Sequence, residues 1–434
     1  MFWTLRTLAL ALLGLPVVVL VPSGWTVTLW IAAVVVLAMV DVIFAPAPKA
    51  VEASRDSGTS IRFGEETTST VTLVNTGRRM RLRVRDVWQP LAGAESAPTA
   101  VKLEAFGSAT VTTTLTPRRR GTVRTHRFVI RSRGVLGLGG RQRSIEVPGS
   151  VTVLPAFPSR RALPSKLVLL RELDGRSAVR TRGHGTEFDA LREYVRGDDV
   201  RSIDWRASAR SKDLVVRTWQ PERDRHVVIV LDTGRLSAGR VEGIPRLDTG
   251  MDAALLMAAI AAKAGDRVHF VAVDREIRAE MNPVAQRIVG ELSDAMAPIE
   301  PSLDVTDWGA LMTHLRRDAL VVLITPLEAE ATTEDLLPFV SVIALKYRVV
   351  VASVTDPALA ELARDGRVDE VDADGLGDID RLQAMAAAET TRSADAAATD
   401  ALIRAGATVI QAPPKELATR LVDHYLWLKR EGRL

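Results

Sequence analysis

Two nearly uninterrupted apolar runs open the chain. Residues 4–21 carry one charged side chain, Arg6, and residues 25–44 carry one, Asp41, each near an end of its run. Helices of these lengths would measure about 27 and 30 Å, enough to cross the hydrocarbon core of a bilayer. No small-residue cleavage site follows the first run, and the second run begins almost at once, which disfavours a cleaved signal peptide. The pattern predicts a transmembrane helical hairpin with two spans over residues 1–48.

Positively charged residues flank this hairpin on one side only. Arg6 precedes the first run, and Lys49, Arg55 and Arg62 follow the second, whereas the turn between the runs has no charge. Cytoplasmic flanks of membrane helices carry an excess of Lys and Arg. We therefore expect a multi-pass cell-membrane protein whose N- and C-termini both lie in the cytoplasm.

A different pattern, the alternation of apolar and polar residues, begins after a short Ala-Pro linker. Such alternation is typical of strands with one buried face, and turn residues separate the segments at short intervals. The alternating segments are 61–74, 80–88, 109–116, 122–131 and 142–153. They predict a small antiparallel β-sandwich over residues 49–158.

One predicted strand carries a row of arginines. Arg81, Arg83 and Arg85 recur with a period of two, so they share one face of the strand. A solvated sheet face is the simplest interpretation, and the functional ones are contact with acidic lipid headgroups or with an acidic partner surface. The neighbouring hairpin favours the anionic lipids of the cytoplasmic leaflet. Nucleic acid is not expected, because the basic run 118–120 has no aromatic neighbour for base stacking.

From residue 226 onward, apolar strands alternate with amphipathic helices. The predicted strands are 226–231, 268–273, 319–324, 348–354 and 407–410. The predicted helices are 248–264, 283–297, 306–317, 332–345, an Ala-rich stretch before the last strand, and 415–430. This order predicts a mostly parallel, doubly wound α/β domain over residues 226–434, so the whole chain is expected to be a multi-domain α+β protein.

Ligands of doubly wound domains bind at the carboxyl ends of the strands. Hydroxyl and carboxyl side chains follow several of the predicted strands. The candidate partner-docking residues at this edge are Asp232, Thr233, Ser237, Asp274 and Thr325.

Composition narrows the possible chemistry. The 434 residues include no Cys, and the six His show no zinc-like spacing, so disulfides, Cys-ligated metals and thiol nucleophiles are excluded. No P-loop is present, which disfavours nucleotide hydrolysis. The net charge of +4 combines two unlike parts, because residues 49–225 hold 34 Lys and Arg against 19 Asp and Glu, whereas residues 226–434 hold 22 against 33.

The most specific motif lies between the two predicted domains, in residues 159–225. Charges of both signs are threaded there with aromatic side chains, which predicts a partly ordered ion-pair network. The spacing resembles the signature of the domain-of-unknown-function 58 family, and it is carried by Phe188, Leu191, Arg192, Tyr194, Gly197, Asp198, Arg201, Ile203, Asp204, Trp205, Ser208, Ala209 and Arg210. The turn 134–138 also resembles a strand-and-turn region of that family, in altered form.

The resemblance implies an architecture and a kind of partner. Members of the family combine a membrane hairpin, a sandwich and a C-terminal von Willebrand factor A-like domain, and they are associated with MoxR-type AAA+ ATPases in chaperone-like maturation or assembly. The resemblance therefore implies association rather than a reaction.

A von Willebrand A-like domain raises the question of a metal-ion-dependent adhesion site, which needs D-x-S-x-S after the first strand and hard oxygen ligands from other loops. Asp232 supplies the first position, but Gly234 and Leu236 stand where the hydroxyls are needed. Thr325 stands where a later Asp is expected, and Arg235 adds positive charge. We therefore expect a degenerate site at Asp232, with no metal and no other cofactor.

The leading hypothesis is a membrane-anchored, cytosol-facing interaction protein, not an enzyme, that docks a MoxR-type AAA+ ATPase. One alternative is a Mg²⁺-dependent adhesion-type binder, and another is a hydrolase that uses carboxylates of the signature segment. Asp198 and Asp204 lie among several arginines, which suits ion pairing better than proton transfer. The segment is thus expected to form a structural hinge that bridges the two domains, with Trp205 as its apolar anchor and the remaining members Phe188, Arg192, Tyr194, Gly197, Asp198, Arg201, Asp204 and Arg210.

Overall fold

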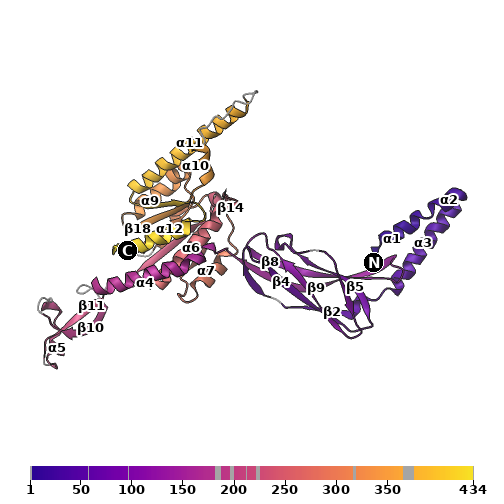
Figure 1. Cartoon of the computed structure of the whole chain (residues 1–434), viewed down its shortest axis with the longest axis horizontal. Coiled ribbons are helices and arrows are strands. Elements are labelled where there is room, and N and C mark those ends of the chain that lie inside the picture. The colour runs from indigo at the N-terminus through magenta and orange to yellow at the C-terminus, as the bar shows by residue number, and fades with distance from the viewer. Residues whose placement is uncertain are drawn as a thin grey trace. The chain divides into compact units, whose positions relative to one another are not determined.

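The computed structural model is a mixed α/β structure that divides into two units, Met1–Leu154 and Pro155–Leu434 (Figure 1). It describes residues 2–433 except 57, 96, 181–186, 196–199, 212, 221–224, 316–318 and 365–375. For 174–180, 187–190, 218–220, 364 and 376–381 the backbone alone is described.

The first unit begins with three apolar helices, α1 (Leu5–Leu12), α2 (Leu15–Leu20) and α3 (Gly24–Phe44). Within the described chain, α3 is the one helix long and apolar enough to cross a membrane. Of the two predicted spans, this finding supports the second only. The first apolar run breaks into α1 and α2 because Pro16 has no N–H to donate to a preceding turn.

The junction between α1 and α2 packs closely on α3. A Cβ atom added at Gly14 would lie 2.2 Å from Trp30 Nε1, so this approach requires glycine.

The N-terminal strand β1 (Phe2–Trp3) pairs with the start of β9 (Gly139–Leu154). The N-terminus consequently lies at the same end of α3 as the sheets of this unit.

A buried carboxylate joins α3 to the sheets. Asp41, which is 3% exposed, accepts the backbone N–H of Leu136 at 2.8 Å through Oδ1. Its Oδ2 accepts the N–H groups of Leu138 at 2.8 Å and Gly139 at 3.0 Å. A Cβ at Gly134 would lie 2.2 Å from Asp41 Oδ1. The glycine-rich turn between β8 and β9 is thus shaped to receive this side chain.

Two sheets complete the first unit. One has the order β1-β9-β8-β5-β6, with β3 paired to β9, and the other has the order β2-β4-β7. Inner-face side chains of both sheets, among them Leu73 and Phe128, share one hydrophobic core. The bounds are β2 Val51–Arg55, β3 Thr59–Arg62, β4 Thr67–Asn75, β5 Met80–Trp88, β6 Thr99–Leu103, β7 Ser108–Leu115 and β8 Gly121–Arg133, with short 3₁₀ turns at Pro48–Ala50 and Pro90–Ala92.

The second unit is built on a six-stranded sheet of order β16-β15-β12-β17-β18-β19. The strands are β12 His226–Asp232, β15 Arg267–Val273, β16 Ile277–Met281, β17 Ala319–Ile324, β18 Arg348–Val354 and β19 Thr408–Ala412. All neighbours pair in parallel except β15 and β16, which form an antiparallel edge. The alternating pattern correctly indicated a mostly parallel sheet, but it did not include β16, a five-residue edge strand in which half-buried and exposed residues alternate and none is fully buried.

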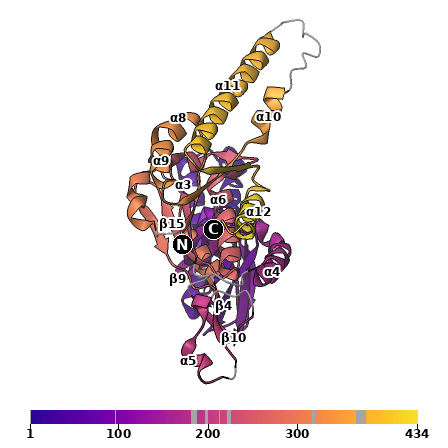
Figure 2. The same ribbon diagram turned by 90° about the vertical axis from the view of Figure 1, so that its left-hand side faces the viewer.

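Helices cover both faces of this sheet (Figure 2). One face packs against α4 (Leu163–Arg180), α6 (Arg246–Lys263), α7 (Ile288–Met296) and α12 (Leu417–Arg430). The other packs against the 3₁₀ segment η6 (Trp308–His314), the π-helical turn η7 (Thr332–Leu336), α9 (Leu337–Ile343) and α11 (Leu376–Arg404). The remaining elements are η3 Pro158–Ala162, β10 Glu187–Glu193, η4 Val200–Ser202, α5 Trp205–Ser208, β11 Val215–Gln220, η5 Arg235–Ala238, β13 Arg240–Val241, β14 Ile244–Pro245, α8 Ala329–Ala331 and α10 Pro357–Arg364.

A buried ion pair in the first unit yields a stability prediction. Arg55 donates to Asp86 at 2.7 and 2.9 Å, and both side chains are almost fully buried. Asp86→Ala would leave the guanidinium without its counter-charge, which typically costs about 3–5 kcal/mol. We expect faster amide hydrogen exchange across β4, β5 and β8 of the full chain. Arg79→Ala, which removes an exposed ion pair with Glu104, should change exchange little, and equal effects of both variants would contradict the prediction.

Candidate functional site

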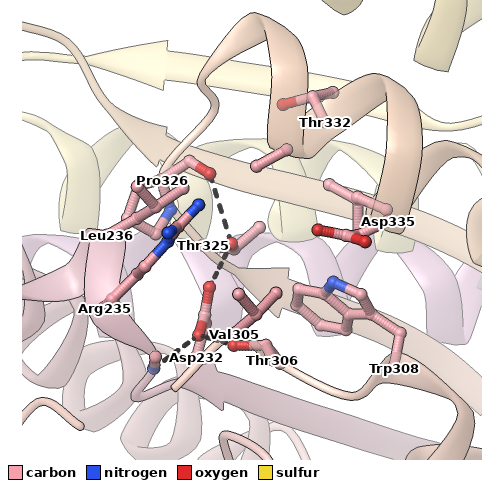
Figure 3. A pocket seen from close by; sticks show the side chains of 13 residues that line it. Asp232, Arg235, Leu236, Val305, Thr306, Trp308, Thr325, Pro326, Thr332 and Asp335 are labelled. Atoms are coloured by element: carbon pink, nitrogen blue, oxygen red, sulfur yellow. Dashed lines mark hydrogen bonds between the residues drawn. The ribbon is translucent and has the colours of Figure 1, made fainter. Parts of the chain in front are cut away.

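The carboxyl ends of β12 and β17 bring two predicted residues together. The two strands pair in parallel up to Leu231 and Ile324, so Asp232 and Thr325 follow neighbouring strand ends. Thr306, from the loop before η6, reaches the same point from a third direction (Figure 3). A carboxylate and two hydroxyls therefore meet at the edge where ligands of such sheets bind.

Asp232 is 5% exposed, and donors surround its carboxylate. Oδ1 accepts the Gly234 N–H at 2.8 Å and the Thr306 hydroxyl at 2.5 Å. Oδ2 accepts the Thr325 hydroxyl at 2.6 Å. Both carboxylate oxygens are thus held by the chain itself.

Burial raises the pKa of Asp232, and the neighbouring carboxylate of Asp274 acts in the same direction. The hydrogen bonds from Thr306, Thr325 and Gly234 oppose this rise, because they stabilise the ionised form. The charge of the Asp232 carboxylate is therefore unfavourable to bury. The donors that stabilise this charge are neutral hydroxyl and N–H groups.

The other predicted docking residues support the loop that follows Asp232. Ser237 donates to the main-chain oxygen of Asp232 at 2.7 Å, and Thr233 donates to Asp274 Oδ2 at 3.1 Å. Arg278 Nε lies 3.5 Å from the same Asp274 oxygen. Thr233, Ser237 and Asp274 are buried, so they shape the loop rather than present a surface to a partner.

A cavity of about 30 Å³ opens beside Asp232, large enough for a water molecule. Figure 3 shows Arg235 on one side of it and Asp335 on the other. The hydroxyl of Thr332, also in its wall, is buried and has no hydrogen-bond partner in the described part of the chain.

A larger groove of about 410 Å³ adjoins this cavity. The stacked rings of Trp308 and Phe339, with centroids 5.8 Å apart, form part of its lining together with Met312, Pro338 and Val342. Its charged lining residues are acidic, and they are Asp307, Glu334 and Asp335. The groove is therefore apolar with an acidic rim.

Sequence reasoning missed the residues contributed by the two loops on this side. Thr306 and Trp308 fall in a segment predicted as one helix over 306–317, whereas the structure has only the short η6 there. The available clue was Asp307, which caps η6 by accepting the Gly309 N–H at 2.9 Å and so marks residue 306 as the end of a loop. Asp335 lies in the π-helical turn, a conformation with no clear sequence pattern.

The residues present do not fit an adhesion-type Mg²⁺ site. A Cβ at Gly234 would lie 2.4 Å from the Thr306 hydroxyl oxygen, so a serine there could not be accommodated without moving Thr306. Thr325 supplies a neutral hydroxyl where such a site uses a carboxylate. In the described residues, no group of three or more His, Cys, Asp or Glu is arranged to hold a metal ion.

The signature segment lies within the second unit rather than between the units. Its strands β10 and β11 form an antiparallel ribbon, closed by η4 and α5. Trp205, predicted as an apolar anchor, is 67% exposed. Among the side chains described in the ribbon, Ile203 and Val216 are buried, and they form a bridge. Trp205 lies at the first position of α5, a helix of four residues that contacts β11 through Ser208 rather than through Trp205.

The ion pair seen in the ribbon joins Asp204 to Arg217 at 2.7 Å, and Arg217 was not among the predicted members. Asp204 also caps α5 by accepting the N–H groups of Arg206 and Ala207 at 3.0 Å. The Ala207 hydrogen bond and Arg217 hold the pKa of Asp204 below its usual value.

The remaining predicted members of the hinge divide into two groups. Arg192 and Tyr194 are half-buried, and Arg201 and Arg210 are exposed, so the predicted hinge of these residues stays a prediction. Gly197 and Asp198 lie outside the described residues, as does the side chain of Phe188.

Comparison with known proteins gives one family match. The model of the family described as "Protein of unknown function DUF58" matches residues 190–400, which supports the DUF58 family indicated by the signature. No curated protein matches the chain.

Solved structures give weak likenesses, each over about a quarter of the chain. The ASH / PapD-like domain of human CEP192 (PapD-like domain 7) is 18% identical over 25% of this chain and 87% of that chain, with a TM-score of 0.20. The complex of Zinc 2-glycoprotein and Prolactin inducible protein from human seminal plasma is 16% identical over 24% and 92%, with a TM-score of 0.20. WR4, a C. elegans MSP family member, is 12% identical over 24% and 97%, with a TM-score of 0.17. These TM-scores are too low to assign a shared fold or function.

The raised pKa of Asp232 predicts a pH dependence of stability. The folded chain binds this proton more tightly than the unfolded chain, whose Asp ionises near 3.8. The stabilisation by the proton is present below that pH and is lost as pH rises through the folded pKa. Asp232→Asn retains an acceptor and removes the titration, so its melting temperature relative to wild type should increase from about pH 4 to about pH 7.

Differential scanning fluorimetry of the full chain across this range measures the effect. Asp335→Asn, at an exposed carboxyl of the same cavity, is the matched control and should follow the wild-type pH profile. If the Asp232→Asn and wild-type profiles run parallel, Asp232 does not titrate as inferred.

Proposed function

We propose that this protein is a membrane-anchored interaction protein whose second unit docks a partner at the groove beside Asp232. The observation that carries the proposal is the combination of an apolar groove with an acidic rim at the carboxyl edge of the sheet. In the lining, Met312 is 44% exposed and Val342 is 54% exposed. Exposed apolar area rimmed by polar groups is typical of protein-binding surfaces.

The chemistry of the groove indicates the kind of segment that it would take. Its three acidic residues would favour a segment carrying Lys or Arg, and its aromatic floor would receive an apolar anchor side chain. Following the family resemblance, we propose a MoxR-type AAA+ ATPase as the partner and chaperone-like maturation or assembly as the process. The protein itself acts as a scaffold and not as an enzyme.

The finer architecture forms part of this proposal. We interpret the two sheets of the first unit as a β-sandwich and the second unit as a von Willebrand A-like domain, because its parallel strands place Asp232 after the central strand β12. In this interpretation the loop after β12 has replaced metal coordination by the hydrogen bonds from Thr306 and Thr325.

Membrane association rests on α3, whose apolar side chains are largely exposed, as with Trp25 and Phe44. We propose that α3 anchors the protein and that the sheets face the cytosol, in agreement with Lys49 and Arg62 after the helix.

Two other functions are less well supported. A Mg²⁺-dependent binder would need ligands that Gly234 and Thr325 do not supply. A hydrolase would need a free carboxylate in the ribbon, and Asp204, the candidate that the structure describes, is engaged as a helix cap and in an ion pair, with a lowered pKa. Neither reaction chemistry nor metal dependence is therefore part of the proposal.

Partner capture tests the groove. Full-length tagged protein, solubilised from membranes in detergent, is expected to retain a MoxR-type ATPase, identified by mass spectrometry, more strongly with ATP than without. Met312→Asp introduces a charge into the apolar lining and should reduce retention about tenfold or more, the range seen for a central interface residue. In a separate capture without ATP, divalent ions are removed with a chelator after the ATPase has bound. The amount of ATPase retained should not change.

The control is Leu345→Asp, at a residue that is 85% exposed and does not line the groove. It should retain the ATPase at the wild-type level. Equal loss in both variants, or no ATPase in any eluate, would refute docking at this groove, and loss on chelation alone would favour the metal-dependent function.

A further inference from the structure

The outer face of the larger sheet in the first unit carries a cluster of cations. Arg81, Arg83 and Arg85 alternate with buried residues along β5, so all three point away from the core. Lys102 of β6 and Arg131 and Arg133 of β8 are exposed on the same face; the cluster Arg81, Arg83, Arg85, Lys102, Arg131 and Arg133 is called the basic face below.

Strand register sets like charges opposite each other. Arg81 pairs with Lys102, and Arg83 pairs with Arg131. Arg133 lies one residue beyond the Leu82–Ser132 pair, next to Arg81. Like charges directly across an antiparallel pair repel and destabilise it. The sheet therefore maintains an unfavourable arrangement that an anion would relieve.

Neighbouring carboxylates do not neutralise these cations. In the described part of the chain, no ion pair involves Arg81, Arg83, Arg85 or Arg133, while Arg131 donates to the neutral side chain of Gln142. Burial, and then the guanidiniums of Arg83, Arg6 and Arg131, lower the pKa of Arg133. In the described residues the positive charge is thus concentrated and has no carboxylate partner, while Arg131 also lies over the Phe2 ring, 5.3 Å from its centroid.

The basic face begins where the apolar helices end. Arg133 pairs with Gly140, and Gly140 pairs with Phe2 of β1, beside the exposed Trp3. Arg141 donates to the carbonyl oxygens of Val42 and Ile43 in the last turn of α3, at 3.0 Å each. Arg131 lies about 7 Å further along β8 than Arg133. Arg133 and Arg131, with Arg81 and Arg83 opposite them on β5, therefore lie within about one headgroup-layer thickness of the end of α3.

We propose that the basic face binds the phosphate groups of anionic phospholipids in the leaflet next to α3. The proposal rests on the membrane association of α3 proposed above. Arginine suits this role because its planar guanidinium donates two parallel hydrogen bonds to a phosphate. An acidic protein is the less favoured occupant, because exposed apolar residues, Trp3, Ile43 and Phe44, border the basic face at the point where it meets α3.

A lipid-competition experiment tests the assignment. Full-length protein in a non-ionic detergent is mixed with equal amounts of phosphatidylglycerol and phosphatidylcholine, repurified, and its bound lipid is measured by mass spectrometry. Wild type should retain phosphatidylglycerol preferentially, and less so at high salt. Arg83→Gln/Arg131→Gln should lower this preference about thirtyfold, as expected for the loss of two interfacial cations.

The matched control is Arg118→Gln/Arg124→Gln, which removes the same charge from exposed positions outside the basic face and should keep the preference. Thermal unfolding provides a second measurement, in which the variant should be at least as stable as wild type although it binds lipid less well. Without anionic lipid, Arg83→Gln/Arg131→Gln should melt at or above the wild-type temperature because it removes a like-charge pair, whereas phosphatidylglycerol should raise the melting temperature of wild type only.

Three results would overturn the proposal: equal lipid retention by wild type and Arg83→Gln/Arg131→Gln, stabilisation of wild type by inorganic phosphate as strongly as by phosphatidylglycerol, or stabilisation by poly-glutamate but not by lipid. Flotation of the wild type with neutral liposomes reports separately on α3. Failure to float would reject the membrane anchor, while loss of lipid preference in a protein that floats would reject the basic face alone.

Discussion

Buried aspartates, and the donors that each must have, organise both units of this chain. A carboxylate removed from water is stable only where several donors converge on it. Asp41 obtains three backbone N–H groups from the turn between β8 and β9. Asp86 obtains Arg55 and the Trp88 indole N–H. Asp232 obtains two threonine hydroxyls and one N–H. Each carboxylate joins segments that are distant in sequence, so each fixes a junction on which the surrounding surface depends.

The choice of donor separates the structural role of Asp41 from the candidate site at Asp232. Backbone N–H groups hold Asp41 in a position where glycine at 134 is required, and this leaves little freedom to rearrange. Around Asp232 two of the three donors are hydroxyls, which can rotate and can also accept hydrogen bonds. Beside Asp232, the cavity is lined by the Thr332 hydroxyl, which has no hydrogen-bond partner among the described residues. The carboxyl edge of the sheet consequently has more freedom to rearrange its hydrogen bonds than the junction at Asp41 has.

Sequence patterns predicted what depends on periodicity and missed what depends on long-range convergence. The parallel strands, α3, the strands of the first unit and the position of Asp232 beside Thr325 all follow from local patterns and one topological rule. Pro16 divides the first apolar run into two short helices, whereas the hydrophobicity of that run alone predicts one continuous span. Thr306 and Trp308 could not be assigned, because no local pattern shows which loop closes over a strand end. Trp205 was misjudged because large aromatic side chains are usually buried, whereas α5 is too short to provide a packing surface.

The charge separation along the sequence takes a definite form once each unit is considered by itself. In the first unit the excess of Lys and Arg gathers on one sheet face, where cross-strand pairs of cations oppose each other. In the second unit the acidic residues Asp307, Glu334 and Asp335 gather around an apolar groove. The two surfaces carry opposite charge, so a single uniformly charged partner could not complement both. A membrane leaflet supplies anions without a specific sequence, and a protein segment supplies cations with an apolar anchor. If lipid binds the basic face and a protein segment binds the groove, as proposed, both sets of charges are compensated.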